Sequence, residues 1–179
     1  GARAPLRGVA WWKRRTIRAF LAPAATGAAP TATPRTLYWG SHRDAAAAQA
    51  DGRGVICEDG FLRSVGLGSD AVPPASLVLD RRGIYYDASR DSDLEHLLAT
   101  HSCSDAELAH GRALIAALRS AGVSKYNTGA AVDVDALLPP RGDGRARVLV
   151  PGQVAGDQSI RLGAVDVADD EALLRAARA

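Results

Sequence analysis

The sequence predicts an α/β fold with a mainly parallel sheet. Three observations support this fold class. Short apolar segments alternate with helical patterns along residues 36–178, two of the helices begin with a capping box, and glycine-containing polar segments follow the strands directly. Ligands of such sheets bind outside the carboxyl ends of the strands, so we expect functional residues there.

The first 21 residues are predicted to contain a basic amphipathic helix over residues 9–21. Its apolar side chains are Trp11, Trp12, Ile17, Phe20 and Leu21, and its cations are Lys13, Arg14, Arg15 and Arg18. Such a helix can lie on an anionic membrane surface, or it can dock on the rest of the protein. Residues 22–35 are rich in Pro and Ala and indicate a linker, so we expect the compact α/β domain to cover residues 36–179.

Strands are predicted over residues 36–39 and 54–58, with a helix over residues 41–50 between them. Residues 76–80 and 84–87 flank Arg81, Arg82 and Gly83, which suggests a hairpin. Helices are predicted to begin after Ser92 and Ser104, each of which is followed three residues later by Glu. A buried strand over residues 147–150 and a helix over residues 169–178 complete the prediction.

The first segment with chemical potential is residues 58–64, directly after the second strand. Its candidate site residues are Glu58, Asp59, Arg63 and Ser64. An arginine can grip a carboxylate or a phosphate with two parallel hydrogen bonds. The alternative from the residues alone is an acidic turn held by a structural ion pair between the arginine and the glutamate.

Two further segments follow a helix and a strand. Lys125 and Asn127 offer a cation and an amide for a sugar or an anion, although a solvated loop has the same composition. Gln153, Asp157 and Ser159 follow the predicted strand at residues 147–150. Asp157 is suited to act as a general base or a covalent nucleophile, or alternatively to cap the helix that follows.

Composition argues against several classes of protein. The net charge of +2 gives no support to nucleic-acid binding, and the two cysteines lack the spacing of a zinc site or a disulfide framework. We therefore expect a reducing, cytoplasmic setting. The apolar segments are shorter than the roughly 20 residues that span a bilayer, and we find no pattern of a signal peptide.

Taken together, four segments resemble the capsule polysaccharide biosynthesis Kdo transferases, where Kdo is an acidic eight-carbon sugar. They are EDGFLRSVGLGSD from Glu58, PPASLVLDRRGIYYDASRDSDLEHLL from Pro73, GVSKYN from Gly122, and VLVPGQVAGDQSI from Val148. The resemblance runs from about Tyr38 to the end of the chain, in order and with the spacing of the family.

The resemblance implies a retaining β-Kdo glycosyltransferase that moves Kdo from CMP-Kdo to a phosphatidylglycerol-type lipid linker. Such enzymes have two Rossmann-like domains around an active-site cleft, and this chain corresponds to the N-terminal half. By motif, Asp157 is the nucleophile, and Glu58 or Asp59 helps to deprotonate the acceptor. Arg63 faces the Kdo carboxylate or a lipid phosphate, and Gln153 and Ser159 position the sugar.

Further expectations come from the same resemblance. Neither a metal nor another cofactor is expected, and the partners are the lipid-linked acceptor glycan, the inner-membrane surface of a Gram-negative bacterium and capsule assembly or export proteins. The nucleotide-binding motifs of the second domain do not occur in this sequence. We therefore expect a C-terminally truncated piece that is inactive alone. The competing functions are a non-catalytic module that binds a glycan or an export partner, and a membrane-surface adaptor.

Overall fold

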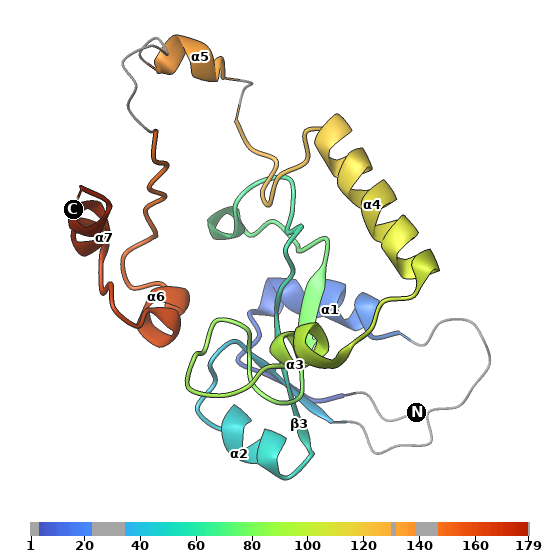
Figure 1. The fold of residues 1–179 in the computed structure, drawn as a ribbon. Helices are drawn as coiled ribbons and strands as arrows, with labels where there is room; N and C mark the ends of the chain where they lie inside the picture. Colours follow the sequence, from blue (N-terminus) through green and yellow to red (C-terminus); the bar gives the residue numbers. More distant parts are fainter. Residues whose placement is uncertain (1–3, 23–34, 130–131, 139–146, 179) are drawn as a thin grey trace. The chain divides into compact units, whose positions relative to one another are not determined.

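The computed structural model describes residues 4–22, 35–129, 132–138 and 147–178 (Figure 1). It divides into two compact units. The first consists of Gly1–Tyr85 and Arg90–Thr128, and the second of Tyr86–Ser89 and Gly129–Ala179.

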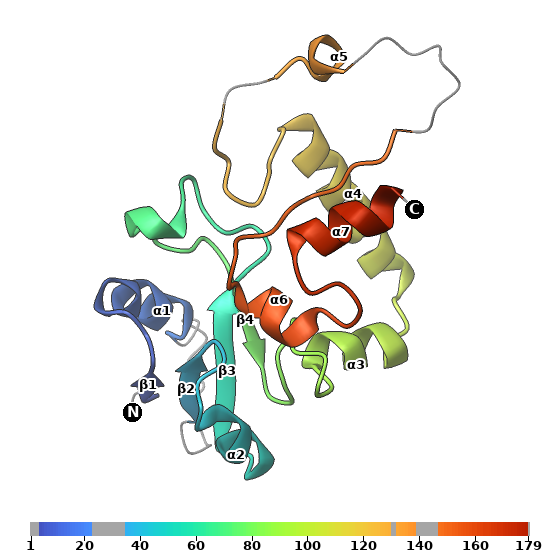
Figure 2. The same cartoon turned by 90° about the vertical axis from the view of Figure 1, so that its left-hand side faces the viewer.

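The first unit is built on a four-stranded sheet in the order β1-β2-β3-β4 (Figure 2). These strands are β1 (Leu6–Arg7), β2 (Thr36–Trp39), β3 (Gly54–Asp59) and β4 (Leu77–Asp80). The pairs β1–β2 and β2–β3 are parallel, whereas β3 and β4 are antiparallel. With helices between the strands, including α2 (Ala45–Ala50), this confirms the predicted α/β class with a mainly parallel sheet.

The N-terminal segment is an integral part of this unit. It contributes β1, a short 3₁₀ turn η1 (Trp11–Lys13) and helix α1 (Arg14–Phe20). Val9 and Ile17 pack with Leu37 and Cys57 in one buried apolar cluster. The compact unit therefore begins well before Thr36, where the sequence placed its start, because the apolar side of the helix is needed to cover the sheet. Residues 23–34 of the predicted linker lie outside the described residues.

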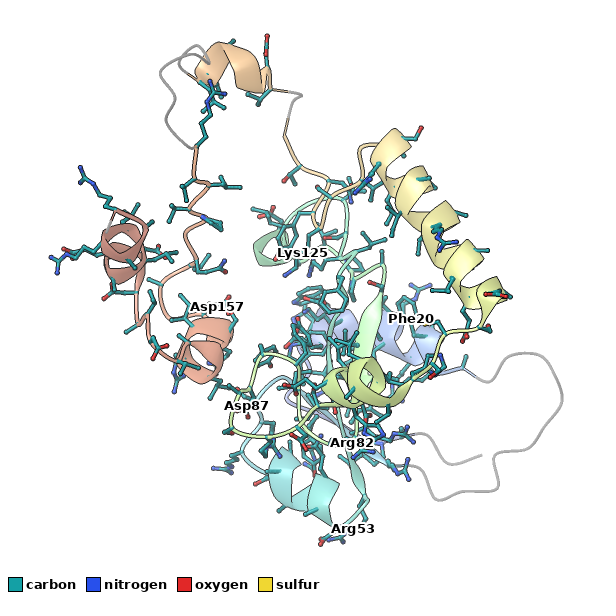
Figure 3. The ribbon with its side chains drawn as sticks, viewed as in Figure 1. Phe20, Arg53, Arg82, Asp87, Lys125 and Asp157 are labelled. Carbon is teal, nitrogen blue, oxygen red and sulfur yellow. The ribbon has the colours of Figure 1, made fainter. Side chains whose placement is uncertain are left out.

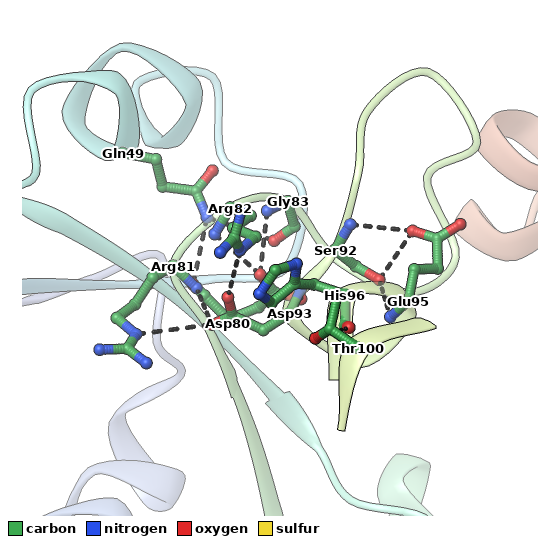
Figure 4. A network of polar contacts seen from close by, with 10 residues as sticks. All are labelled: Gln49, Asp80, Arg81, Arg82, Gly83, Ser92, Asp93, Glu95, His96 and Thr100. Carbon is green, nitrogen blue, oxygen red and sulfur yellow. Dashed lines mark hydrogen bonds and ion pairs between the residues drawn. The ribbon is translucent and has the colours of Figure 1, made fainter. Parts of the chain in front are cut away.

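The predicted hairpin over residues 76–87 is wrong. β4 pairs with β3 instead, and residues 84–87 form no strand. The cause is the carboxylate of Asp80, which is 1% exposed and accepts hydrogen bonds from the backbone N–H groups of Arg82 and Gly83, both at 2.9 Å. Its other oxygen accepts from the N–H of Asp93 at 3.0 Å, which directs the chain into the next helix (Figure 4).

Helices α3 (Asp93–Thr100) and α4 (Asp105–Ser120) begin as predicted, each with a complete capping box. Ser92 accepts from the N–H of Glu95, and Ser104 accepts from that of Glu107. α4 is followed by Gly122 with a φ of +62°, the left-handed conformation that favours glycine after a helix. The apolar side chains of α4 are largely exposed, as at Ile115 with 52%.

The second unit contains α5 (Val134–Leu137), α6 (Gln158–Gly163) and α7 (Asp170–Arg178). The predicted buried strand over residues 147–150 is wrong, since Val148 is 67% exposed and Leu149 is 89% exposed. A strand requires a neighbour for its backbone hydrogen bonds, and no strand in the described ranges pairs with this segment. Within the described residues, every helix is too short or too polar to cross a membrane.

Candidate functional site

The first part of the candidate site lies at the carboxyl edge of the parallel strands. β2 ends at Trp39 and β3 at Asp59, and because the strands are parallel, both ends face the same edge. The chain then turns at Gly60, where a Cβ atom would lie 2.1 Å from the hydroxyl of Ser76. This close approach requires glycine and sets the path of the loop that carries Arg63 and Ser64.

Asp59 is bound by two cations from different parts of the chain. Its Oδ2 accepts from Lys13 Nζ at 3.0 Å and from Arg63 Nε at 3.1 Å. Lys13 also lies over the ring of Trp39, with Nζ 3.8 Å from the ring centroid, and 5.2 Å from that of Trp12. Carboxylate and aromatic ring together replace the water that this ammonium group loses on burial.

Arg63 is enclosed by the protein, with its side chain 2% exposed. Besides Asp59, it donates from Nη1 to Ser64 Oγ at 2.8 Å, and Ser64 in turn donates to the carbonyl of Gly66. Among the described residues, Arg63 Nη2 and Asp59 Oδ1 are buried side-chain atoms without a hydrogen-bond partner. Arg63 thus forms a structural ion pair, as the alternative from the sequence proposed, but the acid is Asp59 and not the expected glutamate.

The predicted segment at Lys125 and Asn127 lies against the same loop. The N–H groups of Arg63 and Ser64 donate to the carbonyl of Lys125, at 2.8 and 3.3 Å. The side-chain amide of Asn127 donates to the carbonyl of Ser64 at 3.0 Å. The backbone of Lys125 and the side chain of Asn127 therefore stabilise the loop that carries Arg63 and Ser64. Six of the nine predicted site residues belong to this first unit.

Glu58 and Asp59 face opposite sides of the sheet, as neighbours in a strand must. Asp59 shares its side with Cys57 and α1, and Glu58 shares the other with Ile56. Glu58 Oε1 accepts from the N–H of Asp59 at 2.9 Å. Burial, reinforced by these two carboxylates, raises the pKa of Cys57 to about 12, so its thiol stays protonated and unreactive.

The second part of the candidate site lies in the second unit. Asp157 is exposed and is the N-cap of α6, with Oδ1 accepting from the N–H and the hydroxyl of Ser159, both at 2.8 Å. The N–H of Gln153 donates to Asp170 at the start of α7. Figure 3 labels Asp157 in this unit and Lys125 in the first. That Asp157 lies beside Glu58 stays a prediction.

Lys13 and Trp39 are the contributors that the sequence did not single out. Lys13 was grouped with the cations of a basic helix, yet it is only 8% exposed. Helical spacing offered a signal, because Lys13 precedes the buried Ile17 by four residues and so shares its side of the helix. What spacing does not reveal is that this side faces Asp59.

Comparisons with known proteins agree with this architecture. Residues 36–133, more than half of the chain, match the family model "Capsule polysaccharide biosynthesis protein". The capsule polysaccharide modification protein LipA of Neisseria meningitidis is 38% identical over 147 residues, 80% of this chain and 20% of LipA. The lipopolysaccharide-processing protein LpsZ of Rhizobium meliloti is 44% identical over 108 residues, 59% of this chain and 24% of LpsZ. The chain therefore spans about a quarter or less of these relatives.

Two solved structures of KpsC from Thermosulfurimonas dismutans are similar over 99% of this chain and 57% of theirs. One is a beta Kdo 2,4 transferase, with a TM-score of 0.71 and 32% identity. The other is a beta Kdo 2,7 transferase, with a TM-score of 0.67 and 28% identity. The resemblance noted in the sequence is confirmed, and the chain belongs to the family of capsule polysaccharide biosynthesis proteins that includes Kdo transferases.

Proposed function

We propose that this chain is part of a retaining β-Kdo transferase that moves Kdo from CMP-Kdo to a phosphatidylglycerol-type lipid linker in capsule assembly. The observation that carries the proposal is the similarity to the KpsC beta Kdo 2,4 transferase over 99% of the chain at 32% identity. The KpsC beta Kdo 2,7 transferase is nearly as similar, so the proposal names the transferred sugar and leaves the linkage open.

Asp157 is the nucleophile in this proposal. Transfer with retained anomeric configuration proceeds through two displacements, and a carboxylate can attack the anomeric carbon and later leave when the acceptor attacks. The exposure of Asp157 supports this role, because a nucleophile must be reachable by the substrate. Its hydrogen bonds to Ser159 hold the carboxylate in one orientation. Gln153 and Ser159 position the sugar, and Glu58 or Asp59 assists the acceptor hydroxyl.

The test uses the full-length protein and an assay of labelled Kdo transfer from CMP-Kdo. Asp157→Asn is the informative change, since asparagine caps a helix about as well as aspartate but does not form the glycosyl ester. Asp169→Asn is the matched control, because Asp169 also caps the following turn, through the N–H of Ala172 at 2.8 Å. Loss of transfer in the first variant alone supports the proposal. Transfer that survives Asp157→Asn contradicts the assigned role.

We also propose that the protein works at the cytoplasmic face of the inner membrane. The support is the outer side of α1 and η1, where Trp11 is 84% exposed and Arg14, Arg15 and Arg18 are exposed. An indole with neighbouring cations suits the headgroup region of an anionic bilayer. Sedimentation with phosphatidylglycerol vesicles should weaken at high salt and in a Trp11→Ser, Arg15→Ser variant. Sedimentation that responds to neither change would remove this part of the proposal.

A further inference from the structure

We infer that Lys13 is a positioning residue for the candidate active site. It fixes Asp59 and the loop that follows, while Glu58 is left as the carboxylate that assists the acceptor. The inference deepens the proposed function and rests on it. It starts from a contact between residues 46 positions apart, the hydrogen bond of Lys13 Nζ to Asp59 Oδ2 at 3.0 Å.

The carboxylate of Asp59 is already occupied by partners within the protein. Its Oδ2 is bonded to both Lys13 and Arg63, and its Oδ1 is buried. A general base must come within hydrogen-bond reach of the proton that it removes. Asp59 is therefore suited to hold the loop in place, and the assisting role goes to Glu58 on the opposite side of the strand.

The two cations that bind Asp59 come from different parts of the chain. Arg63 belongs to the loop after β3, so its ion pair with Asp59 is local. Lys13 comes from the N-terminal segment and lies over Trp39 at the end of β2. It thus joins three chain segments at the carboxyl edge of the sheet. A buried ion pair adds little net stability over apolar packing, whereas it does define one geometry.

The substitution Lys13→Met removes the ammonium group from this contact. In Lys13→Met the methionine retains the apolar stem and Asp59 keeps Arg63, so the fold should persist. Release of one side of the Asp59 carboxylate should move Glu58, the adjacent residue. Displacements of about 1 Å at a site can reduce turnover roughly 10- to 100-fold. The loss should fall on kcat, because the Lys13 ammonium group is buried against Asp59 and Trp39.

The experiment compares three variants of the full-length protein in the Kdo transfer assay, together with their melting temperatures. Lys13→Met should lower kcat at least about tenfold, with a KM for CMP-Kdo within about twofold of wild type. Lys13→Arg keeps a cation that can donate to Asp59 and stack on Trp39, so it should recover part of kcat. Arg112→Met, which removes an exposed cation from α4 of the same unit, should behave like wild type.

Several outcomes would overturn the inference. If Lys13→Met turns over like Arg112→Met, Lys13 has no positioning role, although the proposed function stands. If both Lys13 variants lose activity together with a large fall in melting temperature, the residue is merely structural. Absence of Kdo transfer by the wild-type protein removes both the inference and the proposed function.

One measurement is independent of activity. The effect of Lys13→Met on the melting temperature should shrink when Asp59 is already asparagine, because the ion pair is then absent. Simple addition of the two effects would show that Lys13 and Asp59 are not coupled, and would overturn the inference even if transfer by the wild-type protein upholds the proposed function.

Discussion

Removal of the negative charge of Asp59 should destabilise the first unit much more than removal of the positive charge of Lys13. In Asp59→Asn, Lys13 and Arg63 remain buried beside a neutral amide, and Arg63 is 2% exposed. Leaving a buried charge without its partner costs about 3 to 5 kcal/mol. In Lys13→Met the carboxylate keeps Arg63, and the loss is a partly screened ion pair and a cation–π contact, about 1 kcal/mol.

Urea unfolding followed by tryptophan fluorescence measures this difference. The chain has three tryptophans, Trp11, Trp12 and Trp39, and all lie in the first unit, so the signal reports that unit alone. With a slope of about 2 kcal/mol per molar urea, the midpoint should fall by about 1.5 M or more in Asp59→Asn and by about 0.5 M in Lys13→Met.

Equal shifts in the two variants would refute this reasoning. They would mean that the two cations do not depend on a single carboxylate for their charge balance. A shift below about 0.5 M in Asp59→Asn, with an unchanged slope, would show that solvent reaches Lys13 and Arg63 easily. The unpaired charge of Arg63 would then cost less than about 3 kcal/mol.

Four further predictions follow from separate features. Gly60→Ala should lower the melting temperature by several degrees, because the new methyl would overlap Ser76, and a wild-type melting curve would show that the loop adjusts. Ser92→Ala should reduce the unfolding free energy by about 1 to 2 kcal/mol through loss of a buried cap, and a change below about 0.3 kcal/mol in urea titration would contradict this. At pH 8 a thiol reagent should modify the exposed Cys103 and spare Cys57, and labelling of both in the folded protein would contradict the burial. Because burial raises the pKa of Cys57 to about 12, its contribution to stability is complete below the ordinary thiol pKa of 9.0 and is lost as the pH rises toward 12. Over that range the urea midpoint should fall more for wild type than for Cys57→Ala.

Local signals carried most of the successful prediction of the fold. The strands at residues 36–39 and 54–59 and the capped starts of α3 and α4 depend on neighbours within a few positions. The hairpin prediction failed because Asp80 binds backbone N–H groups of the turn that follows it and of the start of α3, and because β4 pairs with β3. Pairing between strands is a non-local choice, and composition around a turn does not determine it.

The sequence predicted which residue types occur at the candidate site, but it did not predict how these residues contact one another. Polar residues at the end of β3 were expected from the rule for open α/β sheets, and they occur there. The contact of Arg63 with Lys125 joins two segments that the sequence marked separately. The use of Arg63 as an internal ion-pair partner depends on burial, and its partner Asp59 is also bound by Lys13 from a distant part of the chain.

The placement of β1 has a practical consequence for recombinant work on relatives of this chain. The match to the family model begins at residue 36, whereas β1 covers the outer side of β2 through the register Leu6 to Leu37. A protein trimmed to the matched boundary would present an unpaired strand edge and a bare apolar surface at Leu37 and Cys57. Such edges invite aggregation, so insolubility of a trimmed domain would reflect the trimming and not an inherently unstable fold.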